Sequence, residues 1–125
     1  MKTTKPLSCL AAITLALCLC ACSAGGKREE IERRKAALVE KQDTALKNAR
    51  EQLAHYDQIL QQVEASYDSL QPIVEAHRNA LTATEQELRQ LNRLRQHRDS
   101  LRVTCQTLGA KIRLIHRRQK ETQRP

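Results

Sequence analysis

Apolar residues recur every seven positions along most of the chain. One series runs through Val39, Leu46, Leu53, Leu60, Tyr67, Val74, Leu81 and Leu88, and its companion, three residues further on, through Gln42, Ala49, Tyr56, Val63, Leu70, His77, Thr84 and Leu91. These are the a and d positions of a heptad repeat, which form a seam on one face of a helix. A helix in a globular core seldom keeps this period for so long, so the pattern predicts a coiled coil.

Two features interrupt the seam. After Leu88 the spacing slips, and a second seam begins, with one series at Leu94, Leu101, Leu108 and Ile115 and the other at Leu91, Arg98, Cys105 and Ile112. Such a slip indicates a stammer or a break in the helix. Pro72 lies inside the first seam, where a proline costs about 3 kcal/mol and usually kinks or ends a helix. Thr82-x-x-Glu85 and the overlapping Thr84-x-x-Glu87 both match a capping box, which marks the start of a helix.

Composition and charge predict an all-α fold and suggest how it is arranged. Glycine is absent between Gly26 and Gly109, so the chain lacks the turn residues of a sheet. Residues 43–79 carry a net charge of −3 and residues 81–117 a net charge of +5. Antiparallel packing would set these stretches against each other, which favours a helical hairpin that bends between residues 69 and 84. The alternative is one long kinked helix in a parallel oligomer, which the unbroken phase across residues 67–81 favours.

The first 26 residues have a different pattern. Lys2 and Lys5 precede an apolar run of thirteen residues, Leu7 to Leu19, which is short of the ~20 that a membrane-spanning helix needs. The run ends in Leu19-Cys20-Ala21-Cys22, followed by Ser23-Ala-Gly-Gly26. This resembles the lipobox that ends the signal peptide of bacterial lipoproteins, although Cys20 is an unusual residue at its position. The resemblance implies that residues 1–21 are a signal peptide, and that the cleavage motif is Leu19, Ala21 and Cys22, with lipid attached to Cys22.

A lipid on Cys22 would hold the protein at a membrane. In that family the residue after the cysteine influences sorting, and Ser23 favours the outer membrane, facing the periplasm. Residues 22–26 would then form the lipidated end and a flexible linker. The competing interpretation is plain export, with cleavage after Ser23 or Ala24. Cys18, Cys20 and Cys22 are not expected to bind metal, because the leader that holds the first two is removed.

The expected body is a coiled coil over residues 27–118, followed by a disordered basic tail at 119–125. Residues 89–125 carry a net charge of +9, either as a solvated helix face or as a surface for anionic lipid, cell wall or acidic protein. The candidates for anionic-surface binding are Arg89, Arg93, Arg95, Arg98, Arg102, Arg113, Arg117 and Arg118. A basic helix leading into a leucine seam also resembles DNA-binding zipper proteins, but export makes nucleic acid an unexpected partner.

The sequence gives little indication of metal binding, catalysis or thiol chemistry. The four histidines are never four residues apart, so no metal pair on a helix is expected, and no cofactor is implied. No constellation of catalytic residues appears, so the chain is not expected to be an enzyme. Cys105 lies on the second seam, either as a small buried residue or as a cross-link in a parallel dimer.

These features predict a membrane-anchored envelope protein that acts as a coiled-coil structural or interaction module. The candidate partners are another envelope protein and further copies of the same chain. Murein lipoprotein has a similar plan, but it ends in a lysine that is joined to the cell wall, whereas this chain ends in Gln-Arg-Pro. The alternatives are a holdase chaperone and an accessory subunit of an envelope complex. The basic coiled coil is similar to the arms of the periplasmic chaperone Skp in charge and helix type, but the sequence has no strands for Skp's β-rich body.

Overall fold

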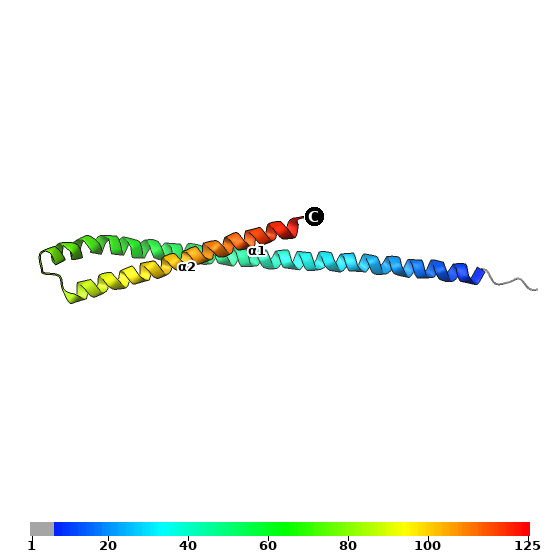
Figure 1. The fold of residues 1–125 in the computed structure, drawn as a ribbon, viewed down its shortest axis with the longest axis horizontal. Coiled ribbons are helices and arrows are strands. Elements are labelled where there is room, and N and C mark those ends of the chain that lie inside the picture. The colour runs from blue at the N-terminus through cyan, green and yellow to red at the C-terminus, as the bar shows by residue number, and fades with distance from the viewer. Residues whose placement is uncertain (1–6) are drawn as a thin grey trace, which may run out of the picture. The chain divides into compact units, whose positions relative to one another are not determined.

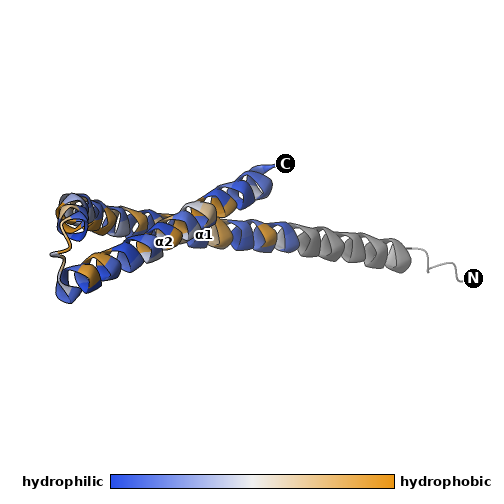
Figure 2. Ribbon diagram, turned by 60° about the vertical axis from the view of Figure 1, so that its left-hand side comes forward, coloured by the Kyte–Doolittle hydropathy of each residue, from blue (hydrophilic) through white to orange (hydrophobic). Residues whose placement is uncertain are grey.

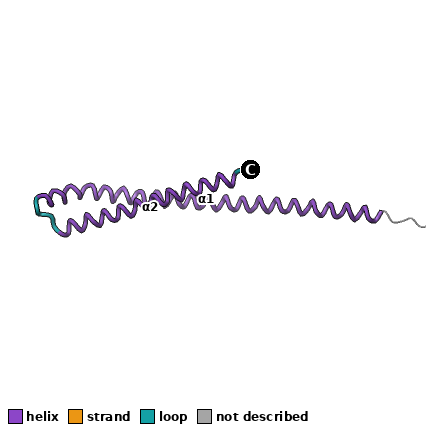
Figure 3. The backbone as a smooth tube through the Cα atoms, viewed as in Figure 1, coloured by secondary structure: helices purple, strands orange, loops and turns teal. Residues whose placement is uncertain are grey.

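A computed structural model of the chain describes residues 7–125, with side chains from residue 25 onward. Two helices make up almost all of this part: α1 spans Leu7–Asn79 and α2 spans Glu85–Gln123 (Figure 3). No β-strand occurs between residues 7 and 125, so the predicted all-α class is confirmed. The chain divides into two compact units, Met1–Lys41 and Gln42–Pro125.

The unit Gln42–Pro125 is an antiparallel hairpin in which α2 runs back alongside the second half of α1 (Figure 1). His77 contacts Glu87 next to the turn, and Gln42 contacts Thr122 at the open end. The two contacts are 35 residues apart on each helix, from His77 back to Gln42 in α1 and from Glu87 forward to Thr122 in α2. Such a constant register is what antiparallel coiled-coil packing requires. The predicted hairpin is therefore confirmed, and its bend falls inside the predicted interval of residues 69–84.

The end of α1 is a Schellman-type stop. The Thr82 amide donates to the His77 carbonyl at 2.8 Å, and the Leu81 amide donates to the Arg78 carbonyl at 3.1 Å. Leu81 takes the left-handed conformation, with φ of 57°, at the position where such stops usually carry glycine. Its side chain is 95% exposed, so it contributes no packing to offset that conformation.

The start of α2 is a capping box built on the second of the two candidate motifs. The Thr84 hydroxyl accepts from the Glu87 amide at 3.2 Å, while the Thr84 amide donates to the Glu87 carboxylate at 2.9 Å. Two amides at the start of α2 are satisfied in this way. The chain therefore reverses within Ala80–Thr84. The hydrogen bonds that end α1 and begin α2 restrict the conformation of this short segment.

Pro72 does not end or divide α1, which continues for seven residues to Asn79. Pro72 is exposed, so its ring points away from the partner helix. Val74, two residues later, is only 1% exposed. Packing of the seam on both sides of the proline offsets its cost, and the helix keeps its phase.

The buried side chains of the hairpin all lie on the two predicted seams. They are Leu46, Ala49, Val63, Val74 and Leu101. The first seam ends at His77, because Leu81, Thr84 and Leu88 are exposed. The phase slip after Leu88 is therefore the chain reversal at residues 80–84, and not a stammer within one helix. Figure 2 shows apolar and polar segments alternating along both helices of the hairpin.

Two boundaries differ from those that the sequence predicted. The end of α2 is Gln123 rather than Arg118, since Gln119 donates to Asp43 at 2.7 Å and Thr122 meets Gln42 across the hairpin. The predicted disordered tail at 119–125 is thus helical over most of its length. Gly25 and Gly26, predicted as part of a flexible linker at 22–26, are helical residues of α1.

In the unit Met1–Lys41, the described side chains from Gly25 onward are exposed except for that of Val39. This stretch is stabilised along its own surface, with Arg34 paired to Glu30 at 2.8 Å and Lys35 paired to Glu32 at 3.9 Å. The predicted signal peptide, residues 1–21, and the motif residues Leu19, Ala21 and Cys22 lie outside the residues whose side chains are described. Among the described residues no helix is long and apolar enough to cross a membrane.

Candidate cationic surface

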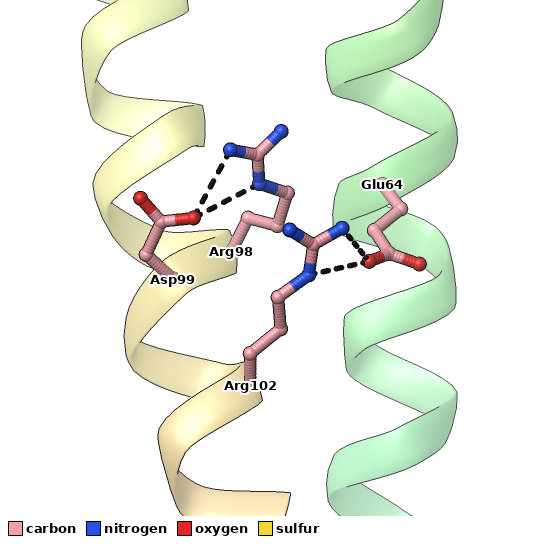
Figure 4. A network of polar contacts seen from close by, with 4 residues as sticks. All are labelled: Glu64, Arg98, Asp99 and Arg102. Carbon is pink, nitrogen blue, oxygen red and sulfur yellow. Dashed lines mark hydrogen bonds and ion pairs between the residues drawn. The ribbon is translucent and has the colours of Figure 1, made fainter.

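Arg98 is held inside the hairpin and is not available to a ligand. Its guanidinium lies 4.3 Å from the centre of the Tyr67 ring and donates to the Asp99 carboxylate at 3.0 and 3.1 Å (Figure 4). Only 17% of its side chain is exposed. The hydrogen bond to Asp99 raises the pKa of Arg98 above its usual value, so the charge is firmly kept. This polar seam position therefore fixes the pairing with Tyr67 of α1.

Arg102 links the two helices. Its Nε and Nη2 atoms both donate to one oxygen of Glu64, at 2.9 and 2.6 Å (Figure 4). Both side chains remain partly exposed, and pairs of that kind contribute up to about 1 kcal/mol. Arg102 is thus a structural partner of α1 rather than part of a binding surface.

Arg89 pairs with Glu85 one turn earlier in α2. Arg93 and Arg95, which follow it, have no ion pair to any described residue. Of the five arginines between residues 89 and 102, three are therefore neutralised within the hairpin. The pairs of Arg89 and Arg98 are local, with Glu85 and Asp99 of the same helix. The sequence could not predict the pair of Arg102, because it depends on which carboxylate lies across the seam.

The last three turns of α2 carry cations that have no counter-ion within the described part of the chain. Arg113, Arg117 and Lys120 follow one another at intervals of four and three residues, which places them on one face of the helix. Together with His116 they line a shallow depression of the surface. We call Arg113, Arg117 and Lys120 the basic column.

Of the other predicted candidates, Arg118 is exposed, but it is not among the residues that line the depression. Lys120 was not among the predicted residues, although its spacing from Arg113 and Arg117 was visible in the sequence. Its omission came from the expectation that the helix ends at Arg118.

Two of the four histidines, His116 and His77, make contacts within the hairpin. His116 Nε2 lies 3.1 Å from Arg50 Nη2 across the hairpin, in a contact where a neutral imidazole accepts from the guanidinium. His77 Nδ1 lies 2.9 Å from Glu87 Oε1 beside the turn. Among the described residues, no group of three or more His, Cys, Asp or Glu side chains is placed to hold a metal ion.

Glu87 joins the turn to both helices. The Thr84 backbone amide lowers the pKa of Glu87 below its ordinary value of 4.5, with further lowering from His77.

Cys105 is a free thiol, half-buried on the second seam as predicted.

No protein-family model matches the chain, and no curated protein or solved structure shows significant similarity to it.

Proposed function

We propose that the protein is a lipid-anchored component of the bacterial cell envelope whose hairpin presents a basic helix to an anionic partner. The anchor is proposed from the sequence of residues 1–22, with acylation at Cys22 and retention at the outer membrane, facing the periplasm. The proposal assigns the hairpin a binding role, carried by its basic helix.

The basic column is the observation that carries the binding role. Arg89, Arg98 and Arg102 are already neutralised by carboxylates of the hairpin, whereas Arg113, Arg117 and Lys120 are not. Three cations on one helix face repel one another and lower the stability of the helix. An anionic partner that bridges them would relieve this repulsion.

The chemistry of the column favours phosphate or carboxylate groups. Guanidinium groups pair with two oxygens of such an anion at once, and the ammonium of Lys120 adds a more flexible contact. Candidate partners in the envelope are an acidic protein surface, anionic lipid or the carboxylates of the cell wall. Binding of this kind weakens as salt is added, because the interacting groups are exposed.

The anchor is tested by intact-mass measurement of the chain purified from bacterial membranes. The expected product begins at Cys22 and carries the mass of its acyl groups. Cys22→Ser should abolish acylation, while Cys105→Ser, the control for loss of a thiol, should leave it intact. A product that begins at Ala24 or Gly25 without lipid would overturn the anchor and support plain export.

The binding role is tested by cross-linking in cells, followed by mass spectrometry of the captured material. The variant Arg113→Gln, Arg117→Gln, Lys120→Gln should reduce capture of one dominant partner by about tenfold or more, given three charge-assisted contacts. The matched control, Arg93→Gln, Arg95→Gln, Lys111→Gln, removes the same charge elsewhere on α2 and should retain capture. An equal loss of partner capture in both variants would contradict a specific role of the basic column, because it would show that only the total charge of α2 matters. Capture of many unfolded barrel proteins would favour the holdase alternative.

A further inference from the structure

The two flanks of the seam differ in charge. On one flank α1 carries Arg50, Asp57, Glu64, Gln71 and Arg78 at seven-residue intervals. This charged flank holds the contacts from Arg50 to His116 and from Glu64 to Arg102. It is the usual flank of a coiled coil, in which paired charges beside the seam favour one arrangement of the helices.

The opposite flank of α1 has no charge between residues 45 and 76. The column beside the seam consists of Ala45, Gln52, Ile59, Ser66 and Ile73. Adding three to each number gives the next column outward, which consists of Asn, His, Gln, Ser and Ala. At the chain's average of 29% charged residues, ten positions would hold about three charges. We call this surface the uncharged flank.

The uncharged flank continues onto α2. The positions that correspond to it between Gln86 and Thr107 hold Gln, Ser, Thr and His residues and a single charge, Arg93. Arg102, by contrast, lies on the charged flank with Glu64. One side of the hairpin is therefore almost free of charge over residues 86–107 of α2 and the part of α1 that lies opposite them.

The apolar surface of α1 is wider than α2 can cover. A helix in a two-stranded coiled coil needs apolar residues only at a and d, whereas a helix in a larger bundle has a third apolar column beside them. Ile59 and Ile73 provide such a third column, and Ile73 is 50% exposed in the hairpin. The pattern of α1 is thus that of a bundle helix that lacks a neighbour on this side.

We propose that the uncharged flank packs against the same flank of a second copy, to form a four-helix bundle with two-fold symmetry. Between residues 42 and 79 α1 has a net charge of −3, and α2 has a net charge of +6. A two-fold axis along the hairpin sets α1 of each copy against α2 of the other, so opposite charges meet. A two-fold axis across the hairpin would set α2 against α2, so positive charges would meet.

The same charges argue for a second copy on this flank rather than on another side. The chain has a formal net charge of +8, and between Gln86 and Thr107 the uncharged flank holds a single one of these charges, Arg93. Two copies therefore meet the least direct charge repulsion when they approach through the uncharged flank. The uncharged flank extends over 22 residues of each helix, a length of about 33 Å. Two helices side by side are about 20 Å wide, so the flank has an area of about 650 Å² per copy. Specific interfaces bury about 600–1,000 Å² per partner.

The first test is the mass of the full chain, purified in mild detergent, by native mass spectrometry. The natural chain should be a dimer, and Ile73→Lys should be a monomer, because dimerisation would bury one added lysine from each copy, two charges in all, in the uncharged contact. Val103→Lys is the matched control, since Val103 is 62% exposed but lies on the outer face of α2. It should remain dimeric, and circular dichroism should show equal helix content in all three proteins. A monomeric natural chain, or a dimer that survives Ile73→Lys, would overturn the proposal.

The second test fixes the orientation with a photo-cross-linking amino acid in place of Leu81 at the exposed turn. A two-fold axis along the hairpin brings the two turns together, so the cross-linked peptide should come from residues near 81 of the second copy. Peptides from the open end, near residues 42 or 122, would overturn the orientation. Peptides from a different protein would overturn the choice of a second copy as the occupant. None of these outcomes depends on the lipid or on the basic column.

Discussion

The turn depends on a left-handed backbone conformation at Leu81, and a leucine side chain is poorly suited to that conformation. The left-handed conformation costs a residue with a Cβ about 1–2 kcal/mol, and glycine avoids most of this cost. Two hydrogen bonds of the Schellman stop hold the residue there, from the Leu81 and Thr82 amides. The hairpin is thus formed in spite of a local strain, which a single substitution can relieve.

Leu81→Gly should stabilise the hairpin by about 0.5–1 kcal/mol, after allowance for the greater freedom of glycine in the unfolded chain. Thermal unfolding of the full chain in detergent, followed by circular dichroism, measures the change. Leu81→Val should lower the melting temperature, because a β-branched residue fits the left-handed region less well. Leu88→Gly, at an exposed leucine in the first turn of α2, should also lower it. A fall in melting temperature with Leu81→Gly would contradict the strain at the turn.

Glu87 gives the turn a dependence on pH. Since its pKa in the folded chain lies below the ordinary value of 4.5, the unfolded chain binds more protons around that pH. Its stabilising contribution is therefore complete above the unfolded value and is lost as the pH falls through the lower native value. Melting temperatures measured from about pH 6 down to about pH 3 should show a smaller loss for Glu87→Gln than for the natural chain. Parallel curves for the two proteins would contradict this role.

Each helix of the hairpin is specified by a seam of its own. In α2 the half-buried and buried positions alternate at three and four residues from Leu91 to Thr122, with Leu101 the most deeply buried. Gly109 interrupts an otherwise strong helical sequence between Leu108 and Ala110. A methyl group added to Gly109 would meet the Arg113 Nη1 atom at 3.6 Å, which is an ordinary contact. The glycine is therefore not required by close packing within the hairpin.

Gly109→Ala should stabilise the full chain by about 0.5–1 kcal/mol, because alanine has the higher helix propensity and the added methyl group has space. Urea unfolding measured by circular dichroism gives the value. A loss of stability would indicate that another chain approaches α2 at this residue. The same substitution should leave the helix content unchanged.

Leu101→Ala should cost about 2–3 kcal/mol, at the lower end of the range for a buried leucine, because the cavity in a two-helix seam opens to solvent. Leu88→Ala should cost less than about 1 kcal/mol, since Leu88 is exposed although it matches the heptad count of the first series. Equal losses for the two variants would place Leu88 on the seam and contradict the fold. Urea unfolding again supplies the comparison.

Heptad spacing was enough to predict the seams, because the buried residues Leu46, Val63 and Leu101 all fall on them. It could not decide between a hairpin and a rod, since Leu81 and Leu88 continue the first series by coincidence although the chain has already reversed. The capping box at Thr84 was the local signal that located the bend. The sequence could not predict which arginines are free, because pairs such as Glu64 with Arg102 join residues 38 positions apart.

For the molecule as a whole, charge is divided between the helices and then between the flanks. The first division favours the hairpin, because the acidic part of α1 lies along the basic α2. The second division leaves one flank of the hairpin with almost no charge and concentrates unpaired cations at the basic column. A hairpin with only a handful of buried side chains has a small core, so association between copies would add a large share of its stability.

If the bundle forms, the melting temperature of the full chain should rise with protein concentration, since dimerisation is linked to folding by mass action. The melting temperature of Ile73→Lys should be independent of concentration, whereas Val103→Lys should behave as the natural chain does. Scanning calorimetry over about a hundredfold range of concentration measures this. A melting temperature independent of concentration in the natural chain would contradict association in the folded state.

The tight turn at Ala80–Thr84 also has a kinetic consequence. The contact from His77 to Glu87 closes a loop of only ten residues, whereas that from Gln42 to Thr122 spans eighty, so loop-closure entropy favours contacts next to the turn. Folding should then proceed as a zipper that starts at the turn. Substitutions at Val74 would slow folding, while substitutions at Leu46 would mainly accelerate unfolding.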